Sequence, residues 1–416
     1  MKTASLARRI ALALAMACTT SLALAADADA DWIYTFQAGT GAKAGRTPAG
    51  PLLRVGSDLY GTTFWGGAAD SGTLYVMKPD GAGWKHQSLF EFPQTSAPDS
   101  VGYNPAGGLV QGPDGAFYGM TTAGARFSNG AIYRVAPQSG GRLKVTLVHA
   151  FEPGSEGSWP TGELAFDAQG NAYGQLANTS GLSGAGALFE LQKTARGSVL
   201  RIVHSFGQSA VDGCNPRGRL ALAADGRLFG ITANCGANGY GTVYEVSGAG
   251  GTESYRVIHD FEDRKSVRPS GGLSIGPAGV LFDTTEGYAF DSRNIWNPVD
   301  STIFRMAPAG NGYDYADIAS FDMGGGTSVI APVDVDAAGR VTGITASGRL
   351  FRLEATPGGS YTQTTLGDMG AQYDVSVQYG VTYTADGRQA IDSSVFAGDI
   401  DKPTAFAGGL FAVPLR

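Results

Sequence analysis

One short motif, an aromatic residue followed by glycine, returns along this chain and constrains its fold more than any other feature. Clear copies lie at residues 59–63, 117–121, 172–174, 228–232 and 281–285, and worn copies lie at 341–345 and 389–393. The seven copies are spaced by 48 to 60 residues. A period of that size is typical of solenoids and propellers, in which one supersecondary unit is repeated.

Each repeat contains four strand-like pieces. The first follows a Pro-x-Gly sequence such as Pro105-Ala106-Gly107, and proline suits the start of a strand because it lacks the N–H donor. A tight turn such as Asp114-Gly115 joins it to the second piece, the aromatic–glycine motif. The third piece reads like Gly72-Thr73-Leu74-Tyr75, and the fourth ends in phenylalanine, as in Leu89-Phe90-Glu91-Phe92. The pattern predicts an all-β fold.

The two ends of the chain decide between a solenoid and a ring. The last repeat stops after its third piece, at residues 413–416, and the matching fourth piece stands at the other end as Trp32-Ile33-Tyr34-Thr35-Phe36. In a closed ring, the first strand would complete the last blade and remove an open edge. The sequence therefore predicts a seven-bladed β-propeller of four-stranded blades, closed by the N-terminal strand, as a single domain over residues 26–416.

At these repeat positions the chain resembles the GloVer (Gloeo/Verruco-type) tandem-repeat proteins. The resemblance covers nearly all of the chain after residue 25, and it is strongest in the first four repeats. It implies an exported, repeat-built bacterial protein, without an activity that can be transferred to named residues. Some relatives carry a C-terminal surface anchor, whereas this chain ends on a strand-like piece, so we expect a soluble protein.

Residues 1–25 have the pattern of a secretory signal peptide. Lys2, Arg8 and Arg9 precede an apolar run over residues 10–17, and Ala23-Leu24-Ala25 is a small-x-small cleavage site. The alternative, a membrane anchor, conflicts with the short apolar run. We expect a periplasmic or secreted protein with no membrane span.

The net charge limits the classes of partner that the protein can bind. Removing the three positive charges of residues 1–25, which contain no acid, changes the formal net charge from −7 to −10. An acidic protein is a poor partner for nucleic acid. We expect a monomer that binds no nucleic acid and whose partner is an extracellular glycan or protein.

The long loops predict where a ligand would bind. If the first piece is innermost, the loops from piece two to three and from piece four to the next repeat share one face, and such loops commonly carry function. The candidate ligand-binding residues on that face are Trp65, Tyr103, Arg126, Trp159, Tyr288, Arg293 and Trp296. Asp70, Asn104, Arg264, Lys265 and Arg268 accompany them. The alternative is that the long loop over residues 286–297 packs its own aromatic side chains.

The sequence offers no clear catalytic set. His149, His204 and His259 share one repeat position on successive outer strands and should not converge, and His86 lies in the matching strand of the first repeat. No histidine is left for a Ser-His-Asp triad.

Some acidic residues leave carboxylate catalysis and metal binding open as alternatives. Asp70, Asp99 and Asp291 are candidates for carboxylate chemistry only because their loops share a face. The Asp-x-Asp segments at residues 334–336 and 399–401 could bind Ca²⁺ but read better as ordinary acids. We expect no metal and no cofactor. The sequence favours a noncatalytic binding or scaffold propeller with a glycan or peptide ligand; the alternative is a propeller enzyme, a hydrolase or lyase, acting on extracellular glycan.

Cys214 and Cys235 are the only cysteines after residue 25. They lie before the first strand and after the second strand of the fourth repeat, and the turn Ala224-Asp225-Gly226 is almost midway between them. Folding that hairpin would place them nearly opposite each other, within the Cα separation that a disulfide requires. We therefore predict a structural disulfide; the alternatives are two free thiols and a redox or metal site.

Overall fold

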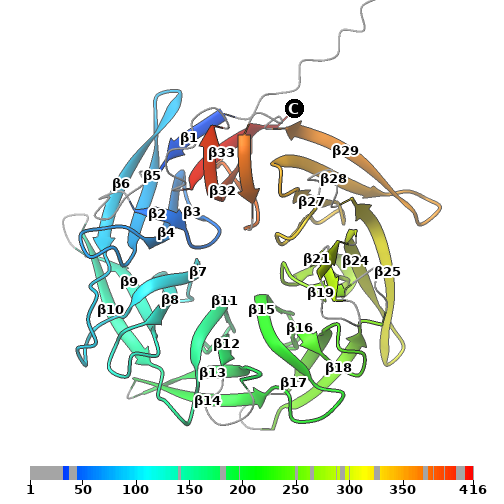
Figure 1. The fold of residues 1–416 in the computed structure, drawn as a ribbon, viewed down its shortest axis with the longest axis horizontal. Coiled ribbons are helices and arrows are strands. Elements are labelled where there is room, and N and C mark those ends of the chain that lie inside the picture. The colour runs from blue at the N-terminus through cyan, green and yellow to red at the C-terminus, as the bar shows by residue number, and fades with distance from the viewer. Residues whose placement is uncertain are drawn as a thin grey trace, which may run out of the picture.

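In the computed structural model, seven antiparallel sheets stand around a central opening (Figure 1). The predicted all-β, seven-bladed propeller is confirmed. The structure describes residues 31–36, 45–138, 142–178, 184–195, 197–248, 252–262, 267–286, 288–290, 296–298, 300–322, 328–368, 373–377, 379–387, 389–399 and 408–415. The predicted signal segment, residues 1–25, lies outside these ranges. Among the described residues, no helix is long and apolar enough to span a membrane.

In blades 1 to 4 the strands run in sequence order from the channel to the rim (Figure 1). Blade 1 contains β2 (Arg46–Pro48), β3 (Leu53–Val55), β4 (Asp58–Trp65), β5 (Thr73–Asp80) and β6 (Gly83–Glu91). Blade 2 contains β7 (Tyr103–Gln111), β8 (Phe117–Ala123), β9 (Ala131–Pro137) and β10 (Leu143–Ala150). Blade 3 contains β11 (Ser158–Phe166), β12 (Ala172–Asn178), β13 (Ala187–Thr194) and β14 (Gly197–Ser205). Blade 4 contains β15 (Gly213–Leu222), β16 (Leu228–Cys235), β17 (Thr242–Ser247) and β18 (Ser254–Asp260).

Blades 5 to 7 keep the same order with interruptions. Blade 5 contains β19 (Val267–Pro269), β20 (Ser274–Ile275), the 3-10 turn η2 (Pro277–Gly279), β21 (Leu281–Glu286), β24 (Ser301–Ala309) and β25 (Gly312–Phe321), with a separate hairpin of β22 (Tyr288–Phe290) and β23 (Trp296–Pro298). Blade 6 contains β26 (Asp334–Val335), β27 (Val341–Ile344), β28 (Arg349–Ala355) and β29 (Tyr361–Asp368). Blade 7 contains β30 (Tyr373–Val377), β31 (Thr382–Tyr383), β32 (Gln389–Asp399), β33 (Gly409–Pro414) and, from the other end of the chain, β1 (Asp31–Thr35).

The hydrophobic core is divided among the seams between blades. Each of seven clusters of buried side chains joins residues of two neighbouring blades. At the seam of blades 1 and 2, for example, Leu74 and Phe92 pack with Leu109 and Tyr133. Because each unit contacts mainly its neighbours, a chain longer than one usual core can fold as one ring.

The repeated motifs are explained by contacts at these seams. A Cβ at Gly72, whose φ is +104°, would lie 2.5 Å from Cδ of Pro105 in the next blade, so the glycine leaves room for that proline. The Gly72 carbonyl accepts a hydrogen bond from the Phe92 N–H at 3.0 Å. The Gly-Thr-Leu-Tyr, Pro-x-Gly and terminal-Phe positions therefore form one joint that recurs around the ring.

The N-terminal strand occupies the outer place of blade 7. β1 pairs antiparallel with β33, with Trp32 opposite Phe411 and Thr35 opposite Gly409. The Phe36 N–H donates to the Gly408 carbonyl at 3.1 Å, which is the bond that Phe92 makes to Gly72 in blade 1. How far this strand holds the ring closed stays a prediction, which deletion of the strand would test.

Candidate functional site

The strand register defines the face of the ring on which the candidate residues lie. The first strand of each blade begins where the second ends: Arg46 pairs with Trp65, Tyr103 with Ala123, and Ser158 with Asn178. We call this side of the ring the loop face. It carries Trp65, Tyr103 and Trp159 at the ends of strands in blades 1, 2 and 3, and Arg126 in the loop after β8.

Three aromatic residues stand along consecutive blades of the loop face, and we call Trp65, Tyr103 and Trp159 the aromatic arc. Trp65 is 38% exposed and Trp159 is 61% exposed. Tyr103 is half-buried, and its ring fills the space where Gly124 lacks a side chain. Arg126 is exposed, with its guanidinium 5.2 Å from the centre of the Phe127 ring. The structure thus places these four predicted residues on one face.

The backbone fixes the position of Trp159 and of four equivalent residues. The residue before the Pro-x-Gly proline has a positive φ in each of blades 1 to 5: Thr47 (58°), Asn104 (54°), Trp159 (60°), Asn215 (57°) and Arg268 (58°). This region is rare for residues other than glycine. Three of these N–H groups donate to a carbonyl of the preceding blade, as from Asn104 to Ser71 at 2.8 Å. The joint between blades therefore holds a strained backbone next to the Pro-x-Gly proline, which lines the channel in blades 2 and 3.

Two polar candidates near the arc are held by protein groups. Asp70 accepts from Arg46 Nη2 at 2.7 Å and from the Gly66 N–H at 2.9 Å, and the hydrogen bond from Arg46 lowers the pKa of Asp70. The Arg46 guanidinium lies 5.4 Å from the centre of the Trp65 ring. Asn104 is buried, and its side-chain amide donates to the Phe64 carbonyl at 2.8 Å. These two residues shape the face.

The long loop of blade 5 contains a hairpin that the sequence pattern did not predict. Phe290 of β22 pairs with Trp296 of β23, and Tyr288 pairs with Pro298. Tyr288 and Trp296 are therefore placed by their backbone. Arg293, Arg264 and Lys265 lie outside the described residues.

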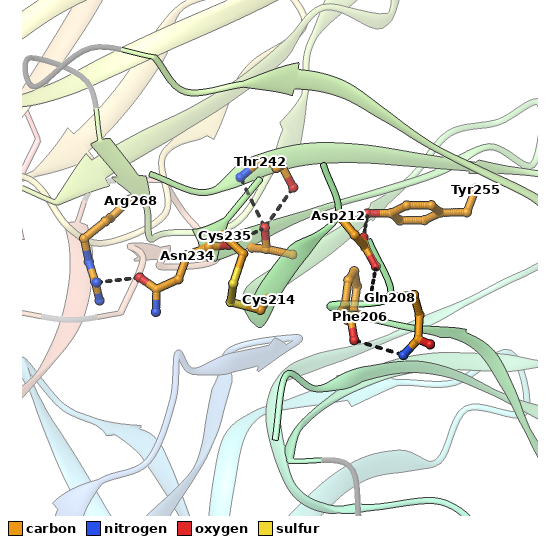
Figure 2. The surroundings of a disulfide bond; sticks show 10 residues. Phe206, Gln208, Asp212, Cys214, Asn234, Cys235, Thr242, Tyr255 and Arg268 are labelled. Atoms are coloured by element: carbon orange, nitrogen blue, oxygen red, sulfur yellow. Dashed lines mark hydrogen bonds between the residues drawn. A yellow bond between two sulfur atoms is a disulfide. The ribbon is translucent and has the colours of Figure 1, made fainter. Parts of the chain in front are cut away.

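The predicted disulfide is confirmed in blade 4 (Figure 2). Cys214 and Cys235 are bonded with a Cα separation of 5.3 Å. Beside the bond, Asn234 Oδ1 accepts from Arg268 Nη1 at 2.5 Å, and Arg268 Nε donates to Glu286 at 2.7 Å. The disulfide therefore fixes one end of a polar network on the loop face.

The same network reaches the inner wall of the ring. Arg217 Nη1 lies 2.6 Å from Glu286 Oε1, and Arg217 Nε donates to the Pro269 carbonyl at 3.0 Å. Burial raises the pKa of Glu286, but Arg217 and Arg268 outweigh this effect and hold the pKa below its usual range. Arg217 and Arg268 thus share one ionised partner.

A central channel of about 740 Å³ runs between the innermost strands, with lining residues from all seven blades. Its wall includes Glu163 and Arg219, which stand at the same position after the Pro-x-Gly glycine in blades 3 and 4. Arg219 Nη2 donates to the Val333 carbonyl at 2.6 Å and pairs with Asp334 at 3.3 Å. Sequence reasoning missed this site. The available signal was two charged residues at a repeat position that elsewhere holds Pro51, Gly108 and Gly272.

Two further carboxyls lie close to Arg219. Asp283 replaces the glycine of the aromatic–glycine motif, is fully buried, and has an Oδ2 atom with no hydrogen-bond partner among the described residues. Burial raises the pKa of Asp283 to about 7, against the opposing effect of backbone N–H donors and of Arg219 and Arg217. Burial likewise raises the pKa of Asp334, and Arg219 opposes it. We call these two and Glu163 the channel carboxyls; of the three, Glu163 is the one in the channel lining.

The histidines stand apart, each in the outer strand of its own blade. His149 contacts Glu156 at 2.8 Å, and the His259 ring stacks on Tyr315 with centroids 4.1 Å apart. The ring of His86 stacks on Tyr34 at 4.3 Å. Within the described ranges, no group of three or more His, Cys, Asp or Glu residues could hold a metal ion.

The first Asp-x-Asp segment divides between two partners. Asp334 pairs with Arg219, whereas Asp336 accepts from the N–H groups of Ala338 and Arg340 and caps its own turn. The two carboxylates do not act as one ligand pair. In the second segment, residues 400 and 401 lie outside the described ranges.

Comparison with known sequences gives one clear match. The profile of the Gloeobacter/Verrucomicrobia repeat matches residues 21–208 and 176–356. No curated protein matches this sequence significantly.

Solved structures share the propeller architecture. A polysaccharide lyase, an ulvan lyase bound to -[GlcA(1-4)Rha3S]-, superposes with a TM-score of 0.56 at 9% identity, covering 92% of this chain and 95% of the lyase chain. Extracellular domains 1–2 of Drosophila Semaphorin 1b give 0.54 at 8% identity, covering 94% and 88%. PorZ, a bacterial surface component of the type-IX secretion system of Porphyromonas gingivalis, gives 0.52 at 12% identity, covering 87% of this chain and 46% of the PorZ chain. At these identities the matches establish a shared fold alone.

Proposed function

The chain belongs to the Gloeobacter/Verrucomicrobia repeat family, and on that premise we propose that it is an exported, noncatalytic binding propeller that holds an extracellular glycan on its loop face. The observation that carries the proposal is the exposure of two tryptophans there. In the described part of the chain, the exposed large apolar side chains are Trp65, Trp159, Val199 and Val211. Rigid aromatic side chains are common binding anchors.

The surroundings of the arc suit a polar polymer with apolar ring faces. An indole ring offers an apolar face and one N–H donor, which matches the mixed surface of a sugar. Arg126 is exposed beside the middle of the arc and supplies hydrogen-bond donors. A peptide could use the same anchors, so peptide binding is the second outcome of the screen described below.

A catalytic role has less support among the candidate residues. Glycan hydrolysis by carboxylates needs two of them flanking the scissile bond. Asp70 is bound by Arg46 and the Gly66 N–H, Asp99 is exposed, and Asp291 lies outside the described residues. A hydrolase or lyase acting on extracellular glycan remains the alternative function, and new reducing ends or unsaturated products from incubated polysaccharides would establish it.

The binding test is a glycan and peptide screen on the protein lacking residues 1–25, followed by calorimetry with any ligand found. Replacing Trp65 and Trp159 with alanine should weaken binding by about thirty-fold or more, because even one anchor residue commonly contributes about 2 kcal/mol. The matched control replaces Val199, which is exposed on the outer strand β14 near the β13–β14 turn, away from the loop face. Equal affinity in the tryptophan variant and the wild type would refute the proposal.

A second variant tests whether the blade 5 hairpin contributes to binding. Replacing Tyr288, Arg293 and Trp296 with alanine should weaken the same ligand if the hairpin contributes to the site. These are loop positions, so stability should change little. A loss of affinity in this variant alone would move the binding site from the arc to blade 5.

Export is part of the proposal. A disulfide is typical of oxidising compartments, and the Cys214–Cys235 bond is consistent with one. We expect the secreted or periplasmic protein to begin at Ala26, as intact-mass measurement would reveal. A mature protein that retains residues 1–25 would contradict the predicted cleavage.

A further inference from the structure

The central channel has two unlike walls. Blades 1 and 2 contribute half-buried apolar residues, including Pro51, Ala106 and Val110. Blades 3 and 4 contribute Glu163 and Arg219. The channel volume, about 740 Å³, falls within the range typical of small-molecule sites, which combine apolar walls with a few convergent polar groups.

The charged wall is short of positive charge. Arg217 and Arg268 share Glu286, and Arg217 acts together with Arg219 on Asp283, so three arginines face four carboxyls: Glu286 and the three channel carboxyls. If all four carboxyls were ionised, the group would carry one unmatched negative charge. Burying unpaired carboxylates is unfavourable, and such groups take up a proton or a nearby cation.

Glu163 is the channel carboxyl that a ligand can reach. It lines the channel, and its Oε1 contacts the Cα side of Gly108, where any side chain would collide with it. Among the described residues, the Glu163 carboxylate has no ion pair within 4.0 Å and no hydrogen bond. Burial raises its pKa, Arg219 lowers it and Asp334 raises it further.

The apolar wall begins next to this carboxylate. A Cβ at Gly108 would also lie 2.9 Å from Cγ of Pro51. The glycine therefore marks a point where an acceptor for a cation and an apolar surface meet. A ligand with a charged end and an apolar body would satisfy both.

We propose that the central channel binds a small organic cation with an apolar body, its ammonium group facing Glu163 and its body lying against the wall of blades 1 and 2. An ammonium group there supplies the one positive charge that the three arginines leave missing, beside the carboxylate that has no ion pair. The site is separate from the loop face, and the proposal does not depend on glycan binding.

Hexylamine is a suitable probe because it carries one ammonium group on a short alkyl chain. Hexanol and hexanoate have matching chains without the positive charge. Calorimetry at about pH 8, where hexylamine stays protonated, should show saturable binding of hexylamine alone. Hexanoate binding as tightly as hexylamine, or no saturable hexylamine binding, would overturn the proposal.

Two variants locate the probe in the channel. Glu163→Gln should weaken hexylamine binding by about thirty-fold, as expected when one partner of a buried charge pair is removed. Ala106→Phe should block binding by filling the channel without changing its charge. Glu354→Gln is the matched control, since Glu354 is an exposed glutamate on β28.

The variants also separate this site from the loop face. The Trp65 and Trp159 double variant should bind hexylamine like the wild type. Unchanged affinity in both Glu163→Gln and Ala106→Phe would place the probe elsewhere and refute the channel site. A loss of binding in the tryptophan variant would do the same.

Discussion

The seam between blades 3 and 4 and the seam between blades 7 and 1 make the same apolar contacts through different connections. Phe206 packs against Tyr244 with ring centroids 5.2 Å apart and an interplanar angle of 56°, and Phe36 packs against Tyr75 at 5.3 Å and 66°. Phe206 belongs to a blade built from consecutive residues, whereas Phe36 follows a strand that arrives from the other end of the chain. The repeat therefore fixes the joint irrespective of the route of the chain.

The two seams differ in their polar groups. At the seam of blades 3 and 4, the Tyr244 hydroxyl reaches Gln175 Oε1 at 3.5 Å, and the Tyr255 hydroxyl donates to Asp212 at 2.8 Å. At the seam of blades 7 and 1, the Tyr75 hydroxyl and His86 Nε2 are buried with no hydrogen-bond partner among the described residues. Each such group costs about 1–3 kcal/mol. We call the seam of blades 7 and 1 the closing seam. Its buried polar groups are less well hydrogen-bonded than those at the seam of blades 3 and 4.

Deleting residues 26–37 should have the largest effect on this comparison. The variant loses β1 and Phe36, which leaves β33 as an open edge and an apolar slot beside Tyr75. It should aggregate or melt well below the protein that begins at residue 26, as differential scanning calorimetry would measure. The control deletes residues 26–30 alone and keeps β1. Equal melting temperatures for the 26–37 deletion and the control would show that the strand does not close the ring.

The sequence was sufficient to predict the ring because recognisable motifs mark the strands and turns of each repeat. Seven copies of one motif predicted the number of blades, and the misplaced Trp32–Phe36 piece predicted the outer strand of blade 7. The disulfide was predictable because the Asp225-Gly226 turn, lying almost midway between the cysteines, fixes the register that brings Cys214 and Cys235 together. Each of these inferences depends on local order along the chain.

The channel and the arc were less predictable because they depend on which way the side chains point in the folded ring. The charge at Glu163 and Arg219 is visible in the sequence, but its meaning requires knowing that these side chains line the lumen. The positive φ of Trp159 arises from the joint between blades, which propensity does not encode. Asp283 marked a departure from the glycine motif, and its burial became apparent only when β21 was placed.

The apolar packing at the two seams can be compared by single substitutions. Phe206→Ala and Phe36→Ala should each lower the free energy of unfolding by about 3–5 kcal/mol, because both rings are almost fully buried. Urea titration of the two variants measures the difference. A cost below about 1 kcal/mol for Phe36→Ala alone would mean that the closing seam is loose.

Removing the disulfide should remove the stability that the Cys214–Cys235 bond gives to blade 4. Replacing Cys214 and Cys235 with serine should lower the free energy of unfolding by about 3 kcal/mol in the loop-entropy model. Urea titration measures the change, and intact-mass analysis after thiol alkylation, with and without reductant, reports the bond. Two alkylated cysteines in periplasmic protein purified without reductant would show that the bond does not form.

The closing seam should also respond to pH through His86. Its ring lies among Tyr34, Phe36 and Tyr75, and burial lowers its pKa from 6.5 to about 4. The unfolded chain therefore binds the proton more readily, so this part of the stability is present above about pH 6.5 and is lost as the pH falls toward 4. His86→Phe should show a smaller drop in urea midpoint between pH 7 and pH 5 than the wild type. An identical drop in both proteins would exclude His86 as the cause.

The smallest expected effect compares the two seam tyrosines. Tyr75→Phe removes a buried hydroxyl that has no partner among the described residues, so the variant should be as stable as the wild type or more stable by up to about 1 kcal/mol. Tyr244→Phe removes the donor to Gln175 and should be destabilising by about 1 kcal/mol. Both rings are fully buried and each change deletes one oxygen, so each variant is the control for the other. If Tyr75→Phe proves to be the more destabilising of the two, the polar groups of the closing seam are satisfied, and the difference between the seams lies in their connections alone.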